Sequence, residues 1–162
     1  MSRVLLAAVV GLVLSAAPRA AADEKYVRLV NVATGKVLSI ADGSSDLGAR
    51  AVVAKDDPKS DAQKWQVDKD GGYVKLTNQN SGKVLDVYEN SKDEGTQIIQ
   101  WEDKPCENDN QRWAWVGDGK ERRLKSKLSG LVLDVDDQGQ VVQKKADEKS
   151  KSQLWRVEEV KK

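Results

Sequence analysis

The sequence predicts an all-β domain built from three four-stranded repeats with pseudo-threefold symmetry. A Val-Leu pair recurs near the centre of each repeat, and its leucines, 47 and 48 positions apart, are Leu38, Leu85 and Leu133. A Gln-x-Trp triplet follows each pair, and its glutamines, 48 and 42 positions apart, are Gln63, Gln111 and Gln153. Two markers that keep the same order three times indicate internal repetition. No segment shows a long helical period.

The second repeat shows the expected order of elements most clearly. Residues 73–77 alternate apolar and polar side chains, as a half-buried strand does. A turn at Asn80-Ser81-Gly82 leads to the β-prone run 84–87, and polar loops separate this run from two further strands at 97–101 and 113–116. The other units repeat this order, with first strands at 26–31 and 122–126. The sequence therefore predicts twelve strands, in repeats at about 26–68, 73–117 and 122–158.

A repeat of this length with four strands is also typical of propeller blades. Propellers need about four to eight blades, however, and this chain has three units. The Gly-His marker of the commonest propeller is absent, because the sequence contains no histidine. Three units that close around a pseudo-threefold axis fit better, and closure also hides strand edges.

The first 22 residues have the layout of a secretory signal peptide. Arg3 precedes an apolar run of 11 residues at 4–14, and Ala20 to Ala22 end the segment in an Ala-x-Ala cleavage pattern. The alternative is a retained membrane anchor, but spanning a bilayer takes about 20 apolar residues. We expect export to the periplasm, cell surface or medium, and a single mature domain at 23–162 without a membrane span.

Charge and composition argue against several classes of function. Without residues 1–22, which carry two arginines and no acid, 27 basic and 26 acidic residues become 25 and 26, a net charge of −1. This balance is unlike the basic footprint of a nucleic-acid-binding protein. The chain has no histidine and one cysteine, Cys106, which is expected to be a surface thiol or to pair with another chain.

The same composition argues against catalysis and against a metal or cofactor. Histidine-based acid–base chemistry is absent, one cysteine builds no metal cluster, and no glycine-rich phosphate loop follows a strand. Adjacent carboxylates at 56–57 and 136–137 are typical of solvated turns, although they leave a paired-carboxylate hydrolase open. We expect a protein that is not an enzyme.

The three units, each ending in Gln-x-Trp, resemble the ricin B-type lectins, which are β-trefoil carbohydrate-binding modules. The resemblance covers about residues 26–158, and it implies a β-trefoil fold. Trp65, Trp113 and Trp155 are expected to anchor the core, since each can bury about 150–250 Å². Their buried indole N–H groups need acceptors, which the backbone of a nearby turn is expected to supply.

The resemblance also implies where a sugar would bind. In these lectins an Asp follows the Val-Leu pair, an aromatic residue ends the third strand, and an Asn precedes Gln-x-Trp. The second repeat has this full set at Asp86, Trp101 and Asn110-Gln111. Asp86 would accept hydroxyl hydrogen bonds, Trp101 would stack on the ring, and Gln111 would brace Asp86 or touch the ligand. Ile99 departs from the pattern, because several such lectins carry Gln there.

The other two repeats lack parts of this set. In the first repeat the corresponding residues are Ser39, Ala54 and Ala62, so no site is expected. The third repeat keeps Asp134 and Gln153 as weaker candidates. Its aromatic and Asn positions hold Lys144 and Ser152, so weak binding or none is expected there.

Other interpretations of these residues remain open from the sequence. Asp86 and Asn110 are also typical turn residues, and strand alternation puts Trp101 on the side of Ile99, which is compatible with a core position. The main hypothesis is a glycan-binding protein, with galactose-type sugars favoured by resemblance only. The alternative is an extracellular protein-interaction or inhibitor module whose loops carry the function. The oligomeric state is not indicated.

Overall fold

A computed structural model describes residues 25–160, and the fold class is all-β as predicted. The first repeat contains β1 (Tyr26–Asn31), β2 (Val37–Ile40), β3 (Ala51–Ala54) and β4 (Trp65–Asp70). The second contains β5 (Tyr73–Asn78), β6 (Val84–Val87), β7 (Ile98–Trp101) and β8 (Trp113–Val116). The third contains β9 (Glu121–Ser126), β10 (Val132–Val135), β11 (Val141–Lys144) and β12 (Trp155–Glu159).

Five single-turn 3-10 helices lie in the loops of the part of the chain that the structure describes. They are η1 (Ala41–Gly43), η2 (Asp61–Gln63), η3 (Tyr88–Asn90), η4 (Asp109–Gln111) and η5 (Lys151–Gln153). The predicted signal segment lies outside the described residues. Within residues 25–160, no helix has the length and apolar character needed to cross a membrane.

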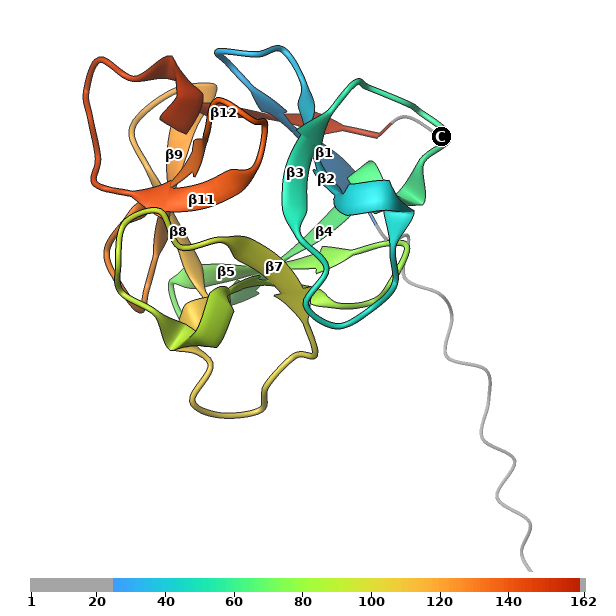
Figure 1. The fold of residues 1–162 in the computed structure, drawn as a ribbon, viewed down its shortest axis with the longest axis horizontal. Helices are drawn as coiled ribbons and strands as arrows, with labels where there is room; N and C mark the ends of the chain where they lie inside the picture. The colour runs from blue at the N-terminus through green and yellow to red at the C-terminus, as the bar shows by residue number, and fades with distance from the viewer. Residues whose placement is uncertain (1–24, 161–162) are drawn as a thin grey trace, which may run out of the picture.

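Six strands form a closed ring. β1 pairs with β4 and β12, β4 with β5, β5 with β8, β8 with β9, and β9 with β12, all antiparallel. Figure 1 shows the three repeats as three lobes around a common centre. Because the ring closes, none of its strands presents a free edge. This arrangement is the predicted β-trefoil.

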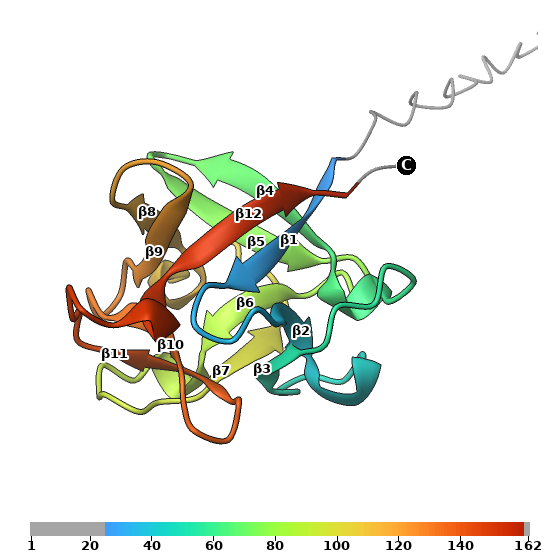
Figure 2. The same ribbon diagram turned by 90° about the horizontal axis from the view of Figure 1, so that it is seen from above.

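Three hairpins cover one end of the ring. They pair β2 with β3, β6 with β7, and β10 with β11, and Figure 2 shows them at the end opposite β4 and β12. Isolated bridges join neighbouring hairpins at Arg50↔Ile99, Val52↔Gln140 and Gln97↔Val142. Each hairpin is therefore held by the repeat before it and the repeat after it.

The three Gln-x-Trp tryptophans lie in one core. Trp65, Trp113 and Trp155 are each 0% exposed. Their Nε1 atoms donate to strand carbonyls within their own repeats, namely Leu38 at 3.1 Å, Leu85 at 3.2 Å and Leu133 at 3.4 Å. The expected turn acceptor is wrong, because each indole donates to the leucine in the second strand of its repeat. Each tryptophan thereby links the last strand of its repeat to the hairpin.

Candidate functional site

A cleft of about 390 Å³ opens on the second repeat, between η3, the end of β7 and the loop that leads to η4. Asp86, Trp101 and Asn110 all line it, so the structure brings together three of the four residues singled out in this repeat. Gln111 is fully buried behind them. Tyr88, Glu89, Asn90 and Lys104 complete the wall, with Ile99 on the floor.

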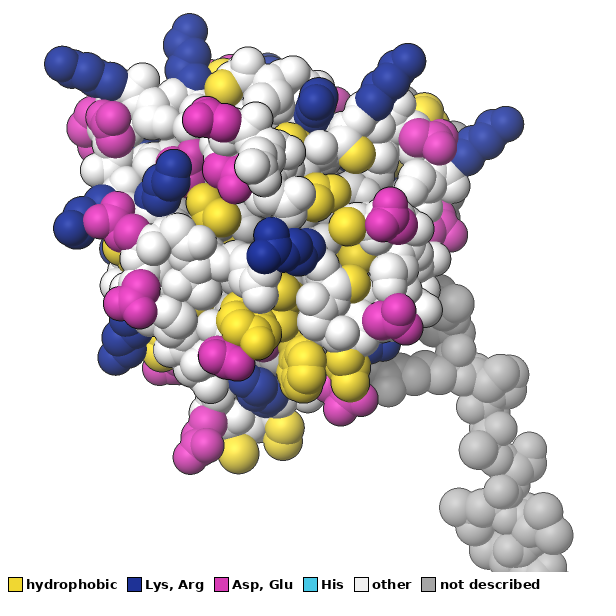
Figure 3. All heavy atoms as spheres, in the orientation of Figure 1, with side chains coloured by type: hydrophobic (Ala, Val, Ile, Leu, Met, Phe, Trp, Pro, Cys, Tyr) yellow, Lys and Arg dark blue, Asp and Glu magenta, His cyan; other side chains and the backbone are white. Residues whose placement is uncertain are grey.

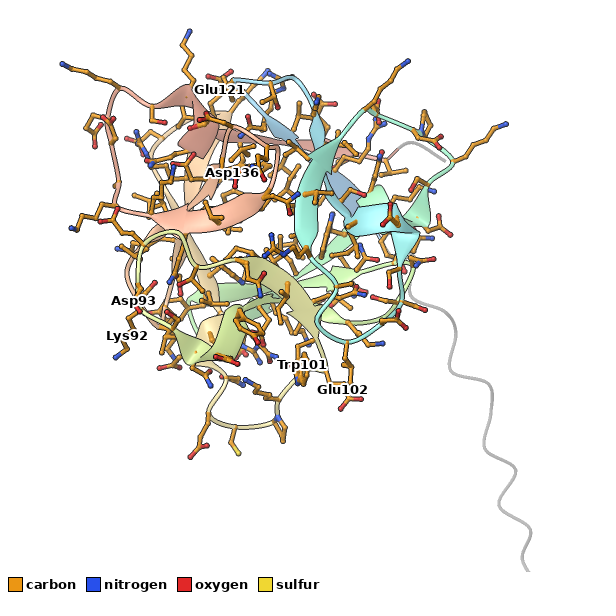
Figure 4. All side chains as sticks on the ribbon, in the orientation of Figure 1. Lys92, Asp93, Trp101, Glu102, Glu121 and Asp136 are labelled. Carbon is orange, nitrogen blue, oxygen red and sulfur yellow. The ribbon has the colours of Figure 1, made fainter. Side chains whose placement is uncertain are left out.

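The strand register places Asp86 and Trp101 on the same face of the hairpin. Asp86 lies opposite Ile99, and Val84 lies opposite Trp101, so the two site residues are diagonal neighbours across β6 and β7. Trp101 is 37% exposed, whereas Ile99 is 2% exposed. Figure 4 shows Trp101 at the end of β7, away from the barrel centre. Trp101 therefore does not belong to the core, although it shares a face with the buried Ile99.

Asp86 is a buried carboxylate at the floor of the cleft. Its Oδ1 accepts a hydrogen bond from Asn110 Nδ2 at 2.8 Å, and its Oδ2 accepts one from Gln111 Nε2 at 2.7 Å. The Lys104 ammonium lies 3.8 Å from Oδ2. A carboxylate has about four lone-pair positions, so these two amides leave acceptor capacity for a ligand. Asp86 is thus held in place without being saturated.

Burial raises the pKa of the Asp86 carboxyl above its usual value of 3.8. The hydrogen bond from Gln111, the charge of Lys104 and the hydrogen bond from Asn110 act in the opposite direction, but burial is the larger effect. The ionised form is therefore less favoured here than at the surface. A ligand that donates hydrogen bonds to the carboxylate would recover part of that cost.

Asn110 orients its neighbours. Its Nδ2 also reaches the Val87 carbonyl at 3.3 Å, and its Oδ1 accepts a hydrogen bond from Lys104 Nζ at 3.2 Å. One amide thus fixes the positions of two charged groups of the cleft, Asp86 and Lys104. A ligand oxygen can still approach the ammonium, which has three donors.

Gln111 fixes the loop after β7. Besides Asp86, its side chain donates to the Glu102 carbonyl at 2.7 Å and accepts from the Lys104 backbone N–H at 2.9 Å. Gln63 and Gln153 make the same pair of backbone bonds in their own repeats. The glutamine of Gln-x-Trp is therefore a loop brace, and Gln111 has no place on the cleft wall.

Gln100 holds the loop that lies beside Trp101, a role that was not predicted from the sequence. Its Oε1 accepts from Ser81 Oγ at 2.6 Å, and its Nε2 donates to the carbonyls of Ser44 and Asp46 at 3.0 and 2.8 Å. The loop of the first repeat is thereby fixed beside the Trp101 ring, at Gly48, where an added Cβ would lie 3.7 Å from the ring.

A matching residue could have signalled this role. Gln143 occupies the same strand position in the third repeat and bonds the carbonyls of Ser91 and Asp93. The first repeat has Val53 at this position. The loop beside Val53 is 136–140 of the third repeat, and it is shorter than the equivalent loops 41–50 and 88–97. The glutamine thus accompanies the long loop that it clamps.

Four residues of the cleft wall were not predicted from the sequence. They are Lys104 and the three η3 residues, Tyr88, Glu89 and Asn90. Tyr88 is 37% exposed, and the nearby Glu89 carboxylate raises the pKa of its phenol. Tyr88 follows Val-Leu-Asp-Val directly, where the other repeats have Ala41 and Asp136, so this aromatic was a readable signal. No repeat pattern marks Lys104.

Figure 3 shows hydrophobic side chains gathered on the lobe of the second repeat. The exposed large hydrophobic residues include Tyr88, Trp101 and Leu47, which lies next to Gly48 on the loop of the first repeat. The cleft is thus an aromatic surface above a buried carboxylate. Such a surface suits a ligand with an apolar face and several hydroxyl groups.

The corresponding positions of the other repeats do not form this arrangement. Ser39 Oγ donates to the carbonyl of Ile40, and Ala54 and Ala62 offer no polar group. Asp134 accepts from Gln153 Nε2 at 3.0 Å and from the Val135 backbone N–H at 2.7 Å.

The third repeat therefore keeps a braced carboxylate but lacks the aromatic ring. Lys144 ends β11 where Trp101 ends β7, and the Ser152 hydroxyl lies 2.7 Å from that of Ser150. Within residues 25–160, no group of three or more His, Cys, Asp or Glu side chains is placed to hold a metal ion. Cys106 is an exposed free thiol.

A family model described as "Ricin-type beta-trefoil lectin domain-like" matches residues 15–101. No curated protein matches the chain by sequence. Among solved structures, the designed threefold-symmetric protein ThreeFoil is 32% identical, with a TM-score of 0.75, and the match covers 82% of this chain and 96% of that one.

Two natural proteins have a similar domain. An exo-β-1,3-galactanase from Clostridium thermocellum is 33% identical, with a TM-score of 0.75, over 85% of this chain and 30% of the enzyme. The Polyporus squamosus lectin, solved with the epitope Neu5Acα2-6Galβ1-4GlcNAc, is 20% identical, with a TM-score of 0.69, over 82% of this chain and 47% of the lectin. The chain thus spans about a third of the galactanase and about half of the lectin, and the lectin likeness concerns the fold alone.

Proposed function

Because the chain belongs to the ricin-type β-trefoil lectin domain-like family, we propose that it is a non-catalytic carbohydrate-binding protein with one sugar site, the cleft of the second repeat. Trp101 stacks on the apolar C–H face of a sugar ring. Asp86 accepts hydrogen bonds from ring hydroxyls, and Lys104 donates to a ring oxygen. Asn110 and Gln111 keep the two charged groups in position.

The observation that carries this proposal is the pairing of an exposed ring with a buried, braced carboxylate. Trp101 is 37% exposed and Asp86 is 2% exposed, and both border one cleft. Charge-assisted hydrogen bonds to a carboxylate are stronger than neutral ones, and aromatic stacking adds apolar contact. Each of the other repeats lacks the ring, which supports one site per chain.

Galactose-type sugars are the favoured ligands. The support is the 33% identity to a domain of an exo-β-1,3-galactanase, whose name states its substrate. We propose that the protein binds such sugars outside the cytoplasm, as the signal-like segment 1–22 indicates. A single shallow site is expected to bind weakly, with a dissociation constant of about 1 mM, which corresponds to about −4 kcal/mol.

A glycan-array screen of residues 23–162 tests the proposal, with Trp101→Ala and Asp134→Asn beside the unmodified chain. The first variant removes the ring. The second changes the braced carboxylate of the third repeat and serves as the matched control. We expect galactose-terminated glycans to bind the unmodified chain and Asp134→Asn but not Trp101→Ala. Absence of binding by a folded sample, or binding that Trp101→Ala leaves intact, would contradict the proposal.

A further inference from the structure

A second hollow of about 570 Å³ adjoins the cleft. The two hollows share three wall residues, Asn90, Lys104 and Asn110. The Lys104 side chain, which is partly exposed, lies between them. The two hollows therefore form one groove that passes Lys104, and the outer hollow adds space beyond the cleft at Trp101.

The outer part of this groove is built between two repeats. One wall is the loop after β7, with Glu107 and Asp109, and the other carries Leu128 from the turn between β9 and β10. The Lys127 backbone N–H bonds the Arg112 carbonyl at 2.9 Å, and the Lys127 ammonium lies 2.7 Å from Asp109 Oδ1. These contacts hold the two walls together, so the hollow does not depend on one mobile loop.

The loop that forms this wall differs from its two counterparts. Trp101 and Asn110 are nine positions apart, whereas Ala54 and Ala62, like Lys144 and Ser152, are eight apart. Glu107, in this longer loop, has φ = 49°, and neither counterpart loop contains a residue with positive φ. A left-handed conformation is unfavourable for a residue with a side chain, and such residues cluster at functional sites.

The charges along the groove indicate the chemistry of its ligand. Four carboxylates line the two hollows, at Asp86, Glu89, Glu107 and Asp109, against one ammonium, that of Lys104. Lys127 offsets the charge of Asp109, but the remaining carboxylates disfavour a ligand that carries a negative charge. Carboxylates and the Asn90 amide suit hydroxyl donors, and Leu128 suits an apolar C–H face.

We propose that the groove binds two or more linked neutral sugars, with the first ring on Trp101 and the next between Glu107 and Leu128. This inference rests on the proposed sugar site at Trp101 and specifies its ligand as a neutral oligosaccharide. Lys104 contacts both rings from its position between the hollows. The outer hollow thus contributes affinity that a monosaccharide does not use.

Isothermal titration with galactose, β-1,3-galactobiose and digalacturonic acid tests the inference. We expect galactobiose to bind about tenfold tighter than galactose, a gain of about 1.4 kcal/mol. Leu128→Ala, which copies Ala33 of the first repeat, is expected to reduce this gain to about twofold while galactose binding stays unchanged. Digalacturonic acid is expected to bind more weakly than galactobiose.

Glu107→Gln supplies a second test, because it removes one carboxylate and keeps the shape. It is expected to reduce the difference in affinity between digalacturonic acid and galactobiose. Glu148→Gln, in the corresponding loop of the third repeat, is expected to leave that difference unchanged. Equal affinity for galactose and galactobiose, or an equal loss for both in Leu128→Ala, would overturn this inference alone. Failure of all three ligands to bind would overturn the proposed galactose site and this inference with it.

Discussion

Gln111 donates its side-chain amide to Asp86 at 2.7 Å, and the equivalent Gln153 donates to Asp134 at 3.0 Å. The second and third repeats thus hold the same braced carboxylate in the same place. Only the second repeat has an aromatic ring at the end of its hairpin. Comparing the two aspartates therefore separates the contribution of the carboxylate to sugar binding from its contribution to the structure of the repeat.

Asp86→Asn is expected to weaken sugar binding about tenfold or more, because a hydrogen bond to a charged group contributes about 1.5–3 kcal/mol. Asp134→Asn, which changes the matching carboxylate, is expected to leave affinity unchanged. Isothermal titration of both variants with β-1,3-galactobiose measures the difference. Equal losses in the two variants would show that the effect is structural.

On acidification, sugar affinity is expected to be lost at a higher pH than it would be if the site contained an Asp with the usual pKa. Burial raises the pKa of Asp86 above 3.8, and the proposed ligand hydroxyls bind the ionised form. Affinity is therefore full above the pKa of the free protein and falls as the pH drops through it. The midpoint of this loss is expected above pH 3.8. Titrations at a series of pH values measure the midpoint, and Asp86→Asn is expected to remove the dependence.

The core and cleft tryptophans are expected to differ in their effect on stability. Trp65→Ala removes a fully buried ring and its hydrogen bond to Leu38, so the free energy of unfolding is expected to fall by about 3–5 kcal/mol. Trp101→Ala is expected to cost less than about 1 kcal/mol, since its ring is partly exposed. Urea unfolding compares the two, and similar losses would mean that Trp101 supports the fold.

Gln100→Val copies Val53 of the first repeat and removes the clamp on the loop beside Trp101. The carbonyls of Ser44 and Asp46 and the Ser81 hydroxyl lose their hydrogen bonds to Gln100, so a loss of stability of about 1–3 kcal/mol is expected. Sugar affinity is expected to fall as well, because the Trp101 ring loses its support. Gln143→Val removes the same type of clamp from the loop after η3, where Gln143 bonds the carbonyls of Ser91 and Asp93, and the η3 residues also line the cleft. It is therefore expected to cost similar stability and to weaken sugar binding as well. Unchanged sugar affinity in Gln100→Val, measured by isothermal titration on a folded sample, would argue against a positioning role for Gln100.

The fold could be predicted from the recurring Gln-x-Trp triplet, because its tryptophan and its glutamine each have a local physical role. A tryptophan that closes a repeat must be buried with its N–H satisfied, and the glutamine two positions before it must brace a loop, so the spacing survives in all three units. Whether Trp101 points into the core or into the cleft could not be predicted in this way. Alternation puts Trp101 on the same face as Ile99, but Ile99 is 2% exposed and Trp101 is 37% exposed, so this face passes from core to cleft within two residues.

Gln100 and Lys104 mark the limit of sequence reasoning for the site. The bonds of Gln100 reach residues 54 and 56 positions away, in another repeat, so no local pattern predicts them. Lys104 lies in a loop whose path depends on Gln111, and one lysine among many carries no signal of its own. Tyr88 was different, because its position after Val-Leu-Asp-Val set it apart from both other repeats.

The most direct test of the central claim is an amide and indole ¹H–¹⁵N correlation spectrum recorded during titration with β-1,3-galactobiose. The chain has five tryptophans, and the Trp101 indole signal is identified by its loss in Trp101→Ala. We predict that the Trp101 signal shifts with added sugar, while those of Trp65, Trp113 and Trp155 stay in place. Shifts confined to residues of the first or third repeat, or a Trp101 signal that does not move while sugar binds, would contradict a site in the second repeat.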